Sequence, residues 1–140
     1  MLKKKKYKPY KAKGKSWGER AISRYLDSLE IEYKYDTPLQ LISPFTGRKL
    51  RFDFDLPKYN LCIEYQGKQH FEYVPELHGL NRDKGLIRVE EQKFKDKLKV
   101  DYCTEKKIRL LVISYTQYKE IKELINFKIK YVPKKRNIAD

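Results

Sequence analysis

Two short segments of alternating residues, joined by a four-residue turn, constrain the fold of this chain most strongly. They span residues 49–56 and 61–67, with the sequence Pro-Lys-Tyr-Asn between them. In the first segment Asp53 is flanked by phenylalanines, and in the second Glu64 follows a cysteine and an isoleucine. Alternation with a turn of this kind is typical of paired strands. The pattern predicts a β-hairpin that carries carboxylates inside core-like strands.

The carboxylates of this hairpin need compensation, because a charged group among apolar residues is unfavourable without a partner. Side chains alternate between the two faces of a strand, so Asp53 and Asp55 share one face. A divalent cation is the natural partner, and Mg²⁺ prefers carboxylates, a backbone carbonyl and water. The expected ligands are Asp53, Glu64 and the carbonyl of Tyr65, with Glu19 binding through water or holding a second ion. Mn²⁺ is the expected substitute.

The composition describes a single domain without a membrane span. A chain of 140 residues buries one core. The longest apolar run lies near residues 108–113 and is far too short to cross a bilayer. No apolar leader follows the lysine-rich start, so we expect an intracellular, cytoplasmic protein. Cys62 and Cys103 lack metal-binding spacing and are expected to be buried, reduced thiols.

Most of the net charge of +14 sits at the two ends of the chain. Eight lysines and no acid lie in residues 1–15, and residues 16–133 carry only +4. Basic ends suit a phosphate backbone, whereas a solvated tail, RNA, the ribosome or an acidic membrane are the alternatives. We divide the chain into a basic flexible arm (1–15), a domain (16–132) and a basic tail (133–140). The residues expected to bind nucleic acid there are Lys3, Lys4, Lys5, Lys6, Lys8, Lys11, Lys13, Lys15, Lys134, Lys135 and Arg136.

The remaining elements follow from periodicity and breakers. Ser16 and Glu19 match a capping box, which predicts a helix near residues 17–29. The other predictions are strands at 31–36 and 39–42 broken by Thr37-Pro38, a loop at 71–87, helices at 88–106 and 117–125, a buried strand at 108–114, and an edge strand or docked tail at 127–131. This order predicts an α/β fold with a mixed central sheet flanked by helices.

Five sequence motifs resemble the PD-(D/E)xK nuclease superfamily, and in particular small phage and large-virus endonucleases related to very-short-patch repair and homing endonucleases. They occur in the expected order over about residues 16–115, which makes the combination more specific than any one motif. The motifs are Gly18-Glu19, Arg51-Phe52-Asp53-Phe54, the stretch Ile63 to His70, Asp96-Lys97-Leu98-Lys99 and Tyr102-Cys103.

The resemblance implies a restriction-endonuclease-like core and a metal-dependent endonuclease that acts on duplex or branched DNA. It implies an acidic metal site on the hairpin with a helical glutamate beside it. His70 would shuttle a proton or contact the scissile phosphate, and Gln69, Asp96 and Lys99 would support the site or contact DNA. The residues implied to be catalytic are Glu19, Asp53, Glu64, Gln66, Lys68 and His70.

Two positions depart from the family pattern, and one of them is Asp55, an extra acid where the family usually has an aromatic residue. Gln66 stands where the superfamily usually has lysine and this subgroup usually has aspartate. A glutamine amide supplies neither positive charge nor a base at neutral pH. Lys68 lies two residues on and would project to the same side if the strand continues past Gly67. Otherwise the site relies on metal alone, or it is impaired.

Several of these residues also have simple structural interpretations. Glu19 needs no metal to explain it, because it completes a capping box. Asp55 is expected to be solvated or paired with an arginine, and His78 to be structural or to contact substrate. Trp17 and the tyrosines are expected to pack, with base stacking by a minority as the alternative.

Two other functions stay open. A nuclease scaffold that has lost its chemistry would bind nucleic acid without cutting it, and a basic protein would bind RNA or the ribosome through its ends. A chain of this size makes one cut per active site, so a double-strand break requires a homodimer or two binding events. The sequence specifies neither that choice nor the DNA target.

Overall fold

The structure is a computed structural model that describes residues 16–131. Its helices and strands follow one another as α1 (Trp17–Ser28), β1 (Lys34–Ile42), β2 (Lys49–Leu56), β3 (Leu61–Gln66), α2 (Pro75–His78), α3 (Arg82–Lys106), β4 (Arg109–Ser114) and α4 (Ile121–Lys130). Three 3-10 turns join them, namely η1 (Pro57–Tyr59), η2 (Lys68–His70) and η3 (Tyr115–Glu120). The predicted α/β class with a mixed sheet is confirmed.

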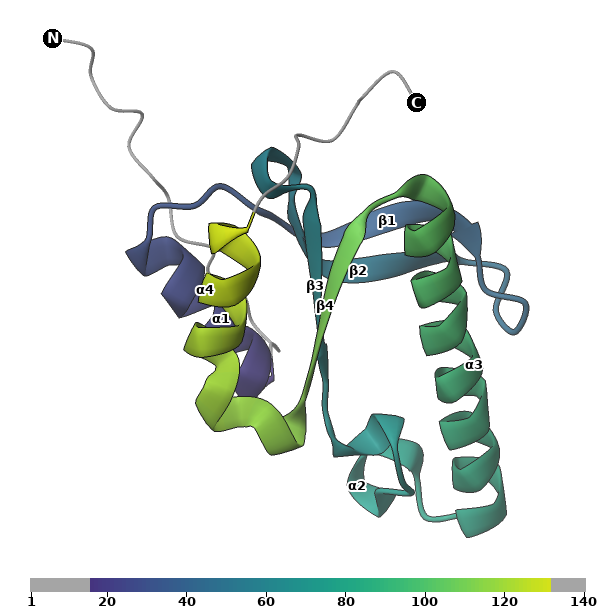
Figure 1. The fold of residues 1–140 in the computed structure, drawn as a ribbon. Coiled ribbons are helices and arrows are strands. Elements are labelled where there is room, and N and C mark those ends of the chain that lie inside the picture. The colour runs from purple at the N-terminus through teal and green to yellow at the C-terminus, as the bar shows by residue number, and fades with distance from the viewer. Residues whose placement is uncertain (1–15, 132–140) are drawn as a thin grey trace, which may run out of the picture.

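The four strands form one sheet in the order β1-β2-β3-β4 (Figure 1). The pairs β1–β2 and β2–β3 are antiparallel, whereas β3 and β4 are parallel. Two parallel neighbours need a crossover connection, and α3 supplies it. The carboxyl ends of β3 and β4 therefore meet at the same end of the sheet.

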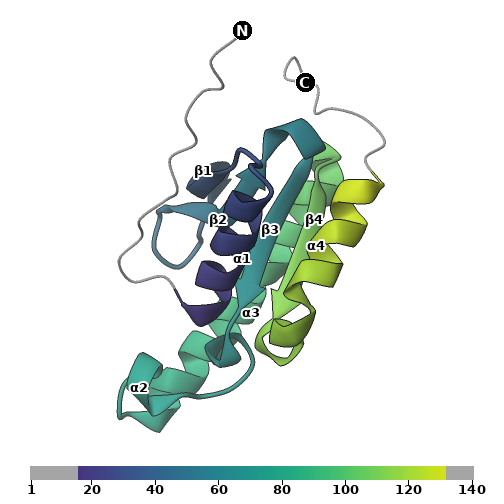
Figure 2. The ribbon, with the colours of Figure 1, turned by 90° about the vertical axis from the view of Figure 1, so that its left-hand side faces the viewer.

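Helices cover both faces of this sheet. The helices α1 and α4 lie on one face and α3 lies on the other (Figures 1 and 2). The larger core joins α1 and α4 to the sheet, and Ile63 belongs to it. The smaller core includes Cys62 and Cys103, the latter from α3. Because strand side chains alternate, Glu64 shares the face of Cys62 and points toward α3.

The hairpin and the first helix form where the sequence predicts them. Ser16 Oγ accepts a hydrogen bond from Glu19 N at 3.2 Å, and Glu19 Oε2 accepts one from Ser16 N at 2.9 Å, so the capping box is present. Asn60 closes the hairpin turn in the left-handed conformation with φ of 47°, which asparagine tolerates better than most residues. Cys62 and Cys103 are both buried, as expected.

The strand β1 runs unbroken through Thr37 and Pro38, where the sequence predicted a break. It is an edge strand that pairs only with β2. Proline is tolerated on an edge strand because its missing N–H can face away from the sheet. The register shifts between Pro38 and Ile42, and this irregularity takes the place of the predicted break.

The predicted loop at 71–87 is wrong in its second half. The helix α3 begins at Arg82, because Asn81 caps it by accepting a hydrogen bond from Lys84 N at 3.1 Å. Gly85 suggested a loop but lies inside this helix. Glycine is needed at this position because a Cβ there would overlap the Tyr73 ring. The short helix α2 precedes the cap.

The predicted strand or tail at 127–131 is helical. Ile129 continues the stripe of Ile121 and Ile125 at four-residue spacing, and all three pack in the larger core. Arg109 donates hydrogen bonds to the carbonyls of Lys128 at 2.9 Å and Tyr131 at 3.2 Å, which satisfies the end of α4. None of the helices between residues 16 and 131 is long and apolar enough to cross a membrane.

Candidate metal and phosphate site

Two carboxylates occupy the point at which β2 and β3 separate. Backbone pairing of these strands extends as far as Phe54 and Ile63. Beyond it, Asp53 N donates to Glu64 Oε1 at 2.8 Å, and Tyr65 N donates to Asp53 Oδ2 at 2.8 Å. Each acid therefore satisfies a backbone donor near the other, and both carboxylates are held in place. The structure brings together the pair that the sequence predicted.

Burial makes this pair hard to ionise. Glu64 is buried with 3% of its surface exposed, and this desolvation raises its pKa above the ordinary value. Burial, followed by the charge of Glu64, raises the pKa of Asp53 to about 8. Both acids are therefore protonated more readily than carboxylates at the protein surface.

Among residues 16–131, Lys99 supplies the one ammonium group in direct contact with these acids. Its Nζ lies 3.0 Å from Glu64 Oε2, and the two side chains are only 12% and 4% exposed. Its charge and hydrogen bond lower the pKa of Glu64 and so oppose part of the effect of burial. We predicted Lys99 as a supporting or DNA-contacting residue, and the structure places it on the acid itself. The cation that Gln66 does not provide comes from α3.

Lys68 does not take that place, which corrects the prediction from strand alternation. The strand β3 ends at Gln66, and residues 68–70 form the turn η2, so the two-residue period stops at Gly67. Lys68 Nζ instead lies 3.1 Å from Glu72 Oε1, with 59% of the lysine side chain exposed.

His70 is held against α3 rather than in line with Glu64. Its Nδ1 lies 2.9 Å from Asp96 Oδ2, and Gln92 Nε2 donates to Asp96 Oδ1 at 2.9 Å. Asp96 also raises the pKa of Glu64 through its charge. Asp96 therefore holds the His70 ring through Nδ1. Sequence reasoning did not assign Gln92.

Glu19 completes the capping box predicted for it, while its role at a metal site stays a prediction. One carboxylate oxygen caps α1, and the other accepts a hydrogen bond from the Tyr35 hydroxyl at 3.1 Å. Its charge helps to raise the pKa of Asp53 and, after burial, the pKa of Tyr35. Glu19 therefore lies within electrostatic reach of the acid pair.

The other predicted residues of the hairpin lie around this centre. Asp55 is buried, with its Oδ1 3.6 Å from Cys62 Sγ, so the expectation of a solvated acid is wrong. Its packing in the interior on the α3 side explains the difference. Gln66 is half-buried at the end of β3, opposite Ser114. Gln69 is half-buried in η2, and His78 accepts a hydrogen bond from Val74 N at 2.9 Å, as a structural residue would.

A basic cleft of about 300 Å³ leads to Asp53 between the β1–β2 hairpin and α3. Of its cationic residues, only Lys99 was predicted from the sequence. Arg48, Lys49 and Arg51 at the start of β2 form a basic run that could have indicated the cleft. Arg51 is paired with Asp36 at 2.8 Å. The basic residues that line the cleft are Arg48, Lys49, Arg51, Lys95 and Lys99.

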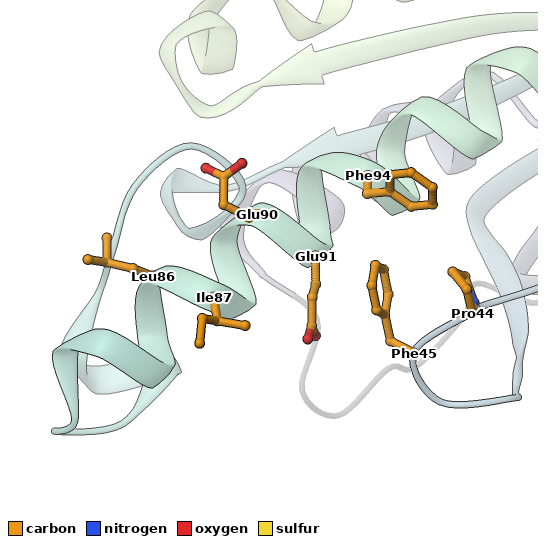
Figure 3. Close-up of a pocket in the computed structure, with 7 residues that line it drawn as sticks. All are labelled: Pro44, Phe45, Leu86, Ile87, Glu90, Glu91 and Phe94. Carbon is orange, nitrogen blue, oxygen red and sulfur yellow. The ribbon is translucent and has the colours of Figure 1, made fainter.

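An apolar groove of about 740 Å³ lies on the other side of the β1–β2 loop (Figure 3). Phe45 of the loop and Phe94 of α3 meet edge to face in it, with ring centroids 5.7 Å apart. The residues that line it are Pro44, Phe45, Leu86, Ile87, Glu90, Glu91 and Phe94, and none belongs to the acid pair. The two hollows therefore share a loop but have different chemistry.

The donor set fits a hard divalent cation. Within residues 16–131 no group of three or more histidines, cysteines and acids has metal-binding geometry. Asp53, Glu64 and the carbonyl of Tyr65 are oxygen donors only, and two carboxylates with a carbonyl suit Mg²⁺, which keeps several waters. A cation between the acids would also offset the unfavourable effect of burial on their ionised forms.

The basic residues predicted at the two ends lie outside the described residues. These are Lys3, Lys4, Lys5, Lys6, Lys8, Lys11, Lys13, Lys15, Lys134, Lys135 and Arg136. The cleft thus gives the described part of the chain its own candidate surface for phosphate.

The relatives of this chain are viral proteins without a described function. It is 30% identical over 102 residues to the uncharacterized protein 033L of Invertebrate iridescent virus 3, covering 72% of this chain and 50% of that protein. It is 32% identical over 81 residues to uncharacterized protein 307L of Invertebrate iridescent virus 6, covering 54% of this chain and 39% of that protein. It is 34% identical over 76 residues to uncharacterized protein 094L of Frog virus 3 (isolate Goorha), covering 54% of this chain and 46% of that protein.

This chain spans half the length or less of these relatives. No family model matches it, and no solved structure matches it. The comparisons therefore show similarity in sequence to viral proteins and assign no activity.

Proposed function

We propose that this chain is a metal-dependent DNA endonuclease with a restriction-endonuclease-like core of the PD-(D/E)xK type. The observation that carries the proposal is the pair of half-buried Asp53 and buried Glu64, each of which accepts a hydrogen bond from a backbone N–H beside the other, with Lys99 in contact with Glu64. A basic cleft reaches this pair from the surface. The order of helices and strands also fits the resemblance seen in the sequence.

The residues have distinct tasks in phosphodiester hydrolysis. Asp53, Glu64 and the carbonyl of Tyr65 would hold Mg²⁺, which when bound supplies charge neutralisation and a more acidic water. Lys99 orients Glu64 and offers positive charge where negative charge builds up on the phosphate. His70, held by Asp96 at Nδ1, would use Nε2 to accept or donate a proton. The cleft lysines and arginines neutralise the DNA backbone.

Cleavage and binding by two variants test the proposal. We expect Asp53→Ala and Glu64→Ala to abolish cleavage of plasmid and branched DNA in Mg²⁺ or Mn²⁺, because each loses a metal ligand. Binding, measured by gel shift, should stay intact or become tighter, since a negative charge is lost. Retained cleavage in both variants would disprove the site assignment.

A scaffold without chemistry is the second candidate, and Gln66 favours it because the family pattern has lysine or aspartate there. The position of Lys99 weakens this candidate, since it brings a cation to Glu64 from α3. Tight DNA binding with no metal-dependent cleavage of any substrate would establish it. Competition between duplex DNA and structured RNA separates both candidates from an RNA-binding protein.

A further inference from the structure

Exposed aromatic rings gather at the carboxyl ends of β3 and β4. Trp17 is 75% exposed, so the expectation that it packs in the core is wrong. It begins α1, whereas the other rings follow η2 or belong to η3, and these segments lie at the same end of the sheet (Figures 1 and 2). We call this set the aromatic edge, and it consists of Trp17, Phe71, Tyr115 and Tyr118.

The aromatic edge adjoins the acid pair through Tyr65. The first turn of α1 lies directly on the Tyr65 ring, because a Cβ added at Gly18 would overlap that ring. Tyr65 follows Glu64 in β3, and its N–H donates to Asp53. The rings of Phe71 and Tyr115 are 5.9 Å apart across the two turns. The aromatic edge therefore lies next to Tyr65, whose backbone N–H binds Asp53.

Its chemistry suits flat, negatively charged partners. Single exposed apolar residues are common on protein surfaces, but a group of them marks an interaction site. Lys68 in η2, whose exposed ammonium group pairs with Glu72, also lies within electrostatic reach of Tyr115. Flat rings with a nearby cation are the usual means of holding nucleotide bases together with their phosphates.

Paired bases do not offer their faces to such rings. In a duplex each base is already stacked between its neighbours, whereas an unpaired base exposes a face that an aromatic side chain can cover. Stacking of this kind tolerates every base, because each has a π-face. The arrangement therefore favours strands with unpaired nucleotides.

We propose that the aromatic edge stacks on unpaired bases of a DNA strand that passes the acid pair. This inference rests on the proposed function and narrows its substrate class to DNA with a single-stranded flap, gap or branch. Trp17 and Phe71 would act as binding residues for bases, while the acids and Lys99 act on the phosphate.

Trp17 is the only tryptophan of the chain, so its fluorescence reports on the aromatic edge directly. We would titrate the full chain in EDTA with a blunt duplex and with the same duplex carrying an unpaired tail. Excitation at the red edge avoids the twelve tyrosines. We expect quenching by the tailed DNA and little or none by the blunt duplex.

Variants then test whether the ring itself binds. Trp17→Ala should weaken binding of labelled tailed DNA by about tenfold, which corresponds to the loss of one stacked base. Its affinity for the blunt duplex should not change. Trp17→Phe should restore part of the preference, and Phe127→Ala, which removes an exposed ring from α4, should leave both affinities unchanged.

Equal quenching by both DNAs, or a Trp17→Ala variant that keeps its preference for the tail, would overturn this inference. Plasmid nicking in Mg²⁺ by the wild-type protein, with Glu64→Ala as its control, distinguishes that failure from failure of the proposed function. A protein that nicks duplex plasmid but shows no preference for a tail is an endonuclease without this binding surface.

Discussion

Burial of Asp53 links the stability of this protein to pH. Its pKa is about 8 in the folded state and 3.8 as the ordinary value. Between these values the folded state binds more protons than the unfolded state, so stability falls as pH rises. The pKa of Glu64 is shifted in the same direction, which adds to the loss.

The first prediction concerns the stability of the metal-free protein. In EDTA we expect the free energy of unfolding to decrease between about pH 5 and pH 8, by no more than about 1.4 kcal/mol per pH unit for one group. Urea denaturation at several pH values measures this. In Asp53→Asn, whose amide oxygen can still accept from Tyr65 N, the slope should be shallower. Parallel profiles for the two proteins would contradict the prediction.

The second prediction asks which of two lysines supplies the catalytic positive charge, which the sequence alone could not decide. Lys99 contacts Glu64 and is buried, whereas Lys68 pairs with Glu72 at the surface. Removing a charge positioned at the reacting group typically costs about 100-fold or more in rate. We expect that loss of nicking rate for Lys99→Ala and an unchanged rate for Lys68→Ala. The reverse order would place the catalytic cation in η2.

At the scale of elements, the helix α1 fixes the geometry of the site through one glycine. Gly18 allows the first turn of α1 to rest on the Tyr65 ring, next to the acids. Overpacking at such a contact typically costs about 1–3 kcal/mol. We expect Gly18→Ala to lower the free energy of unfolding by that amount in urea denaturation.

The neighbouring position provides the control for this effect. Trp17 is mostly exposed, so Trp17→Ala should leave stability unchanged because it removes little packing. If Gly18→Ala is as stable as wild type, the ring of Tyr65 moves aside freely and α1 does not fix the site.

Local patterns predicted the elements that depend on neighbours in sequence. The capping box of Ser16 and Glu19 predicted α1, and alternation around Asp53 and Glu64 predicted the hairpin and its acid pair. Buried carboxylates in apolar strands were informative because they need compensation. The continuity of β1 through Pro38 was not predictable, since it depends on the edge position of that strand in the sheet.

Contacts between distant elements account for the remaining errors. Lys99 reaches Glu64 over 35 positions of sequence, and no local period indicates such a contact. Lys68 was misplaced because alternation says nothing about where a strand ends, and β3 ends at Gln66 before η2 begins. The early start of α3 depends on one cap residue, Asn81, within a stretch otherwise typical of a loop.

At the scale of the whole molecule, positive charge is divided between the ends of the chain and the cleft. Residues 1–14 contain seven lysines and no acid, whereas the cleft holds its basic residues beside Asp53. Each phosphate neutralised makes binding more sensitive to salt. We expect deletion of residues 1–14 to weaken DNA binding and to flatten the dependence of log K on log salt concentration. An unchanged slope in fluorescence anisotropy titrations would mean that these lysines do not contact DNA.

The central claim is that Asp53 and Glu64 hold a metal ion that cleaves DNA. The most direct measurement is the rate at which wild-type protein and Glu64→Ala nick supercoiled plasmid in Mg²⁺, with EDTA as the metal-free reference. We predict nicking by the wild type that EDTA stops and that Glu64→Ala lacks. Nicking by Glu64→Ala at the wild-type rate, or wild-type nicking that persists in EDTA, would contradict the claim.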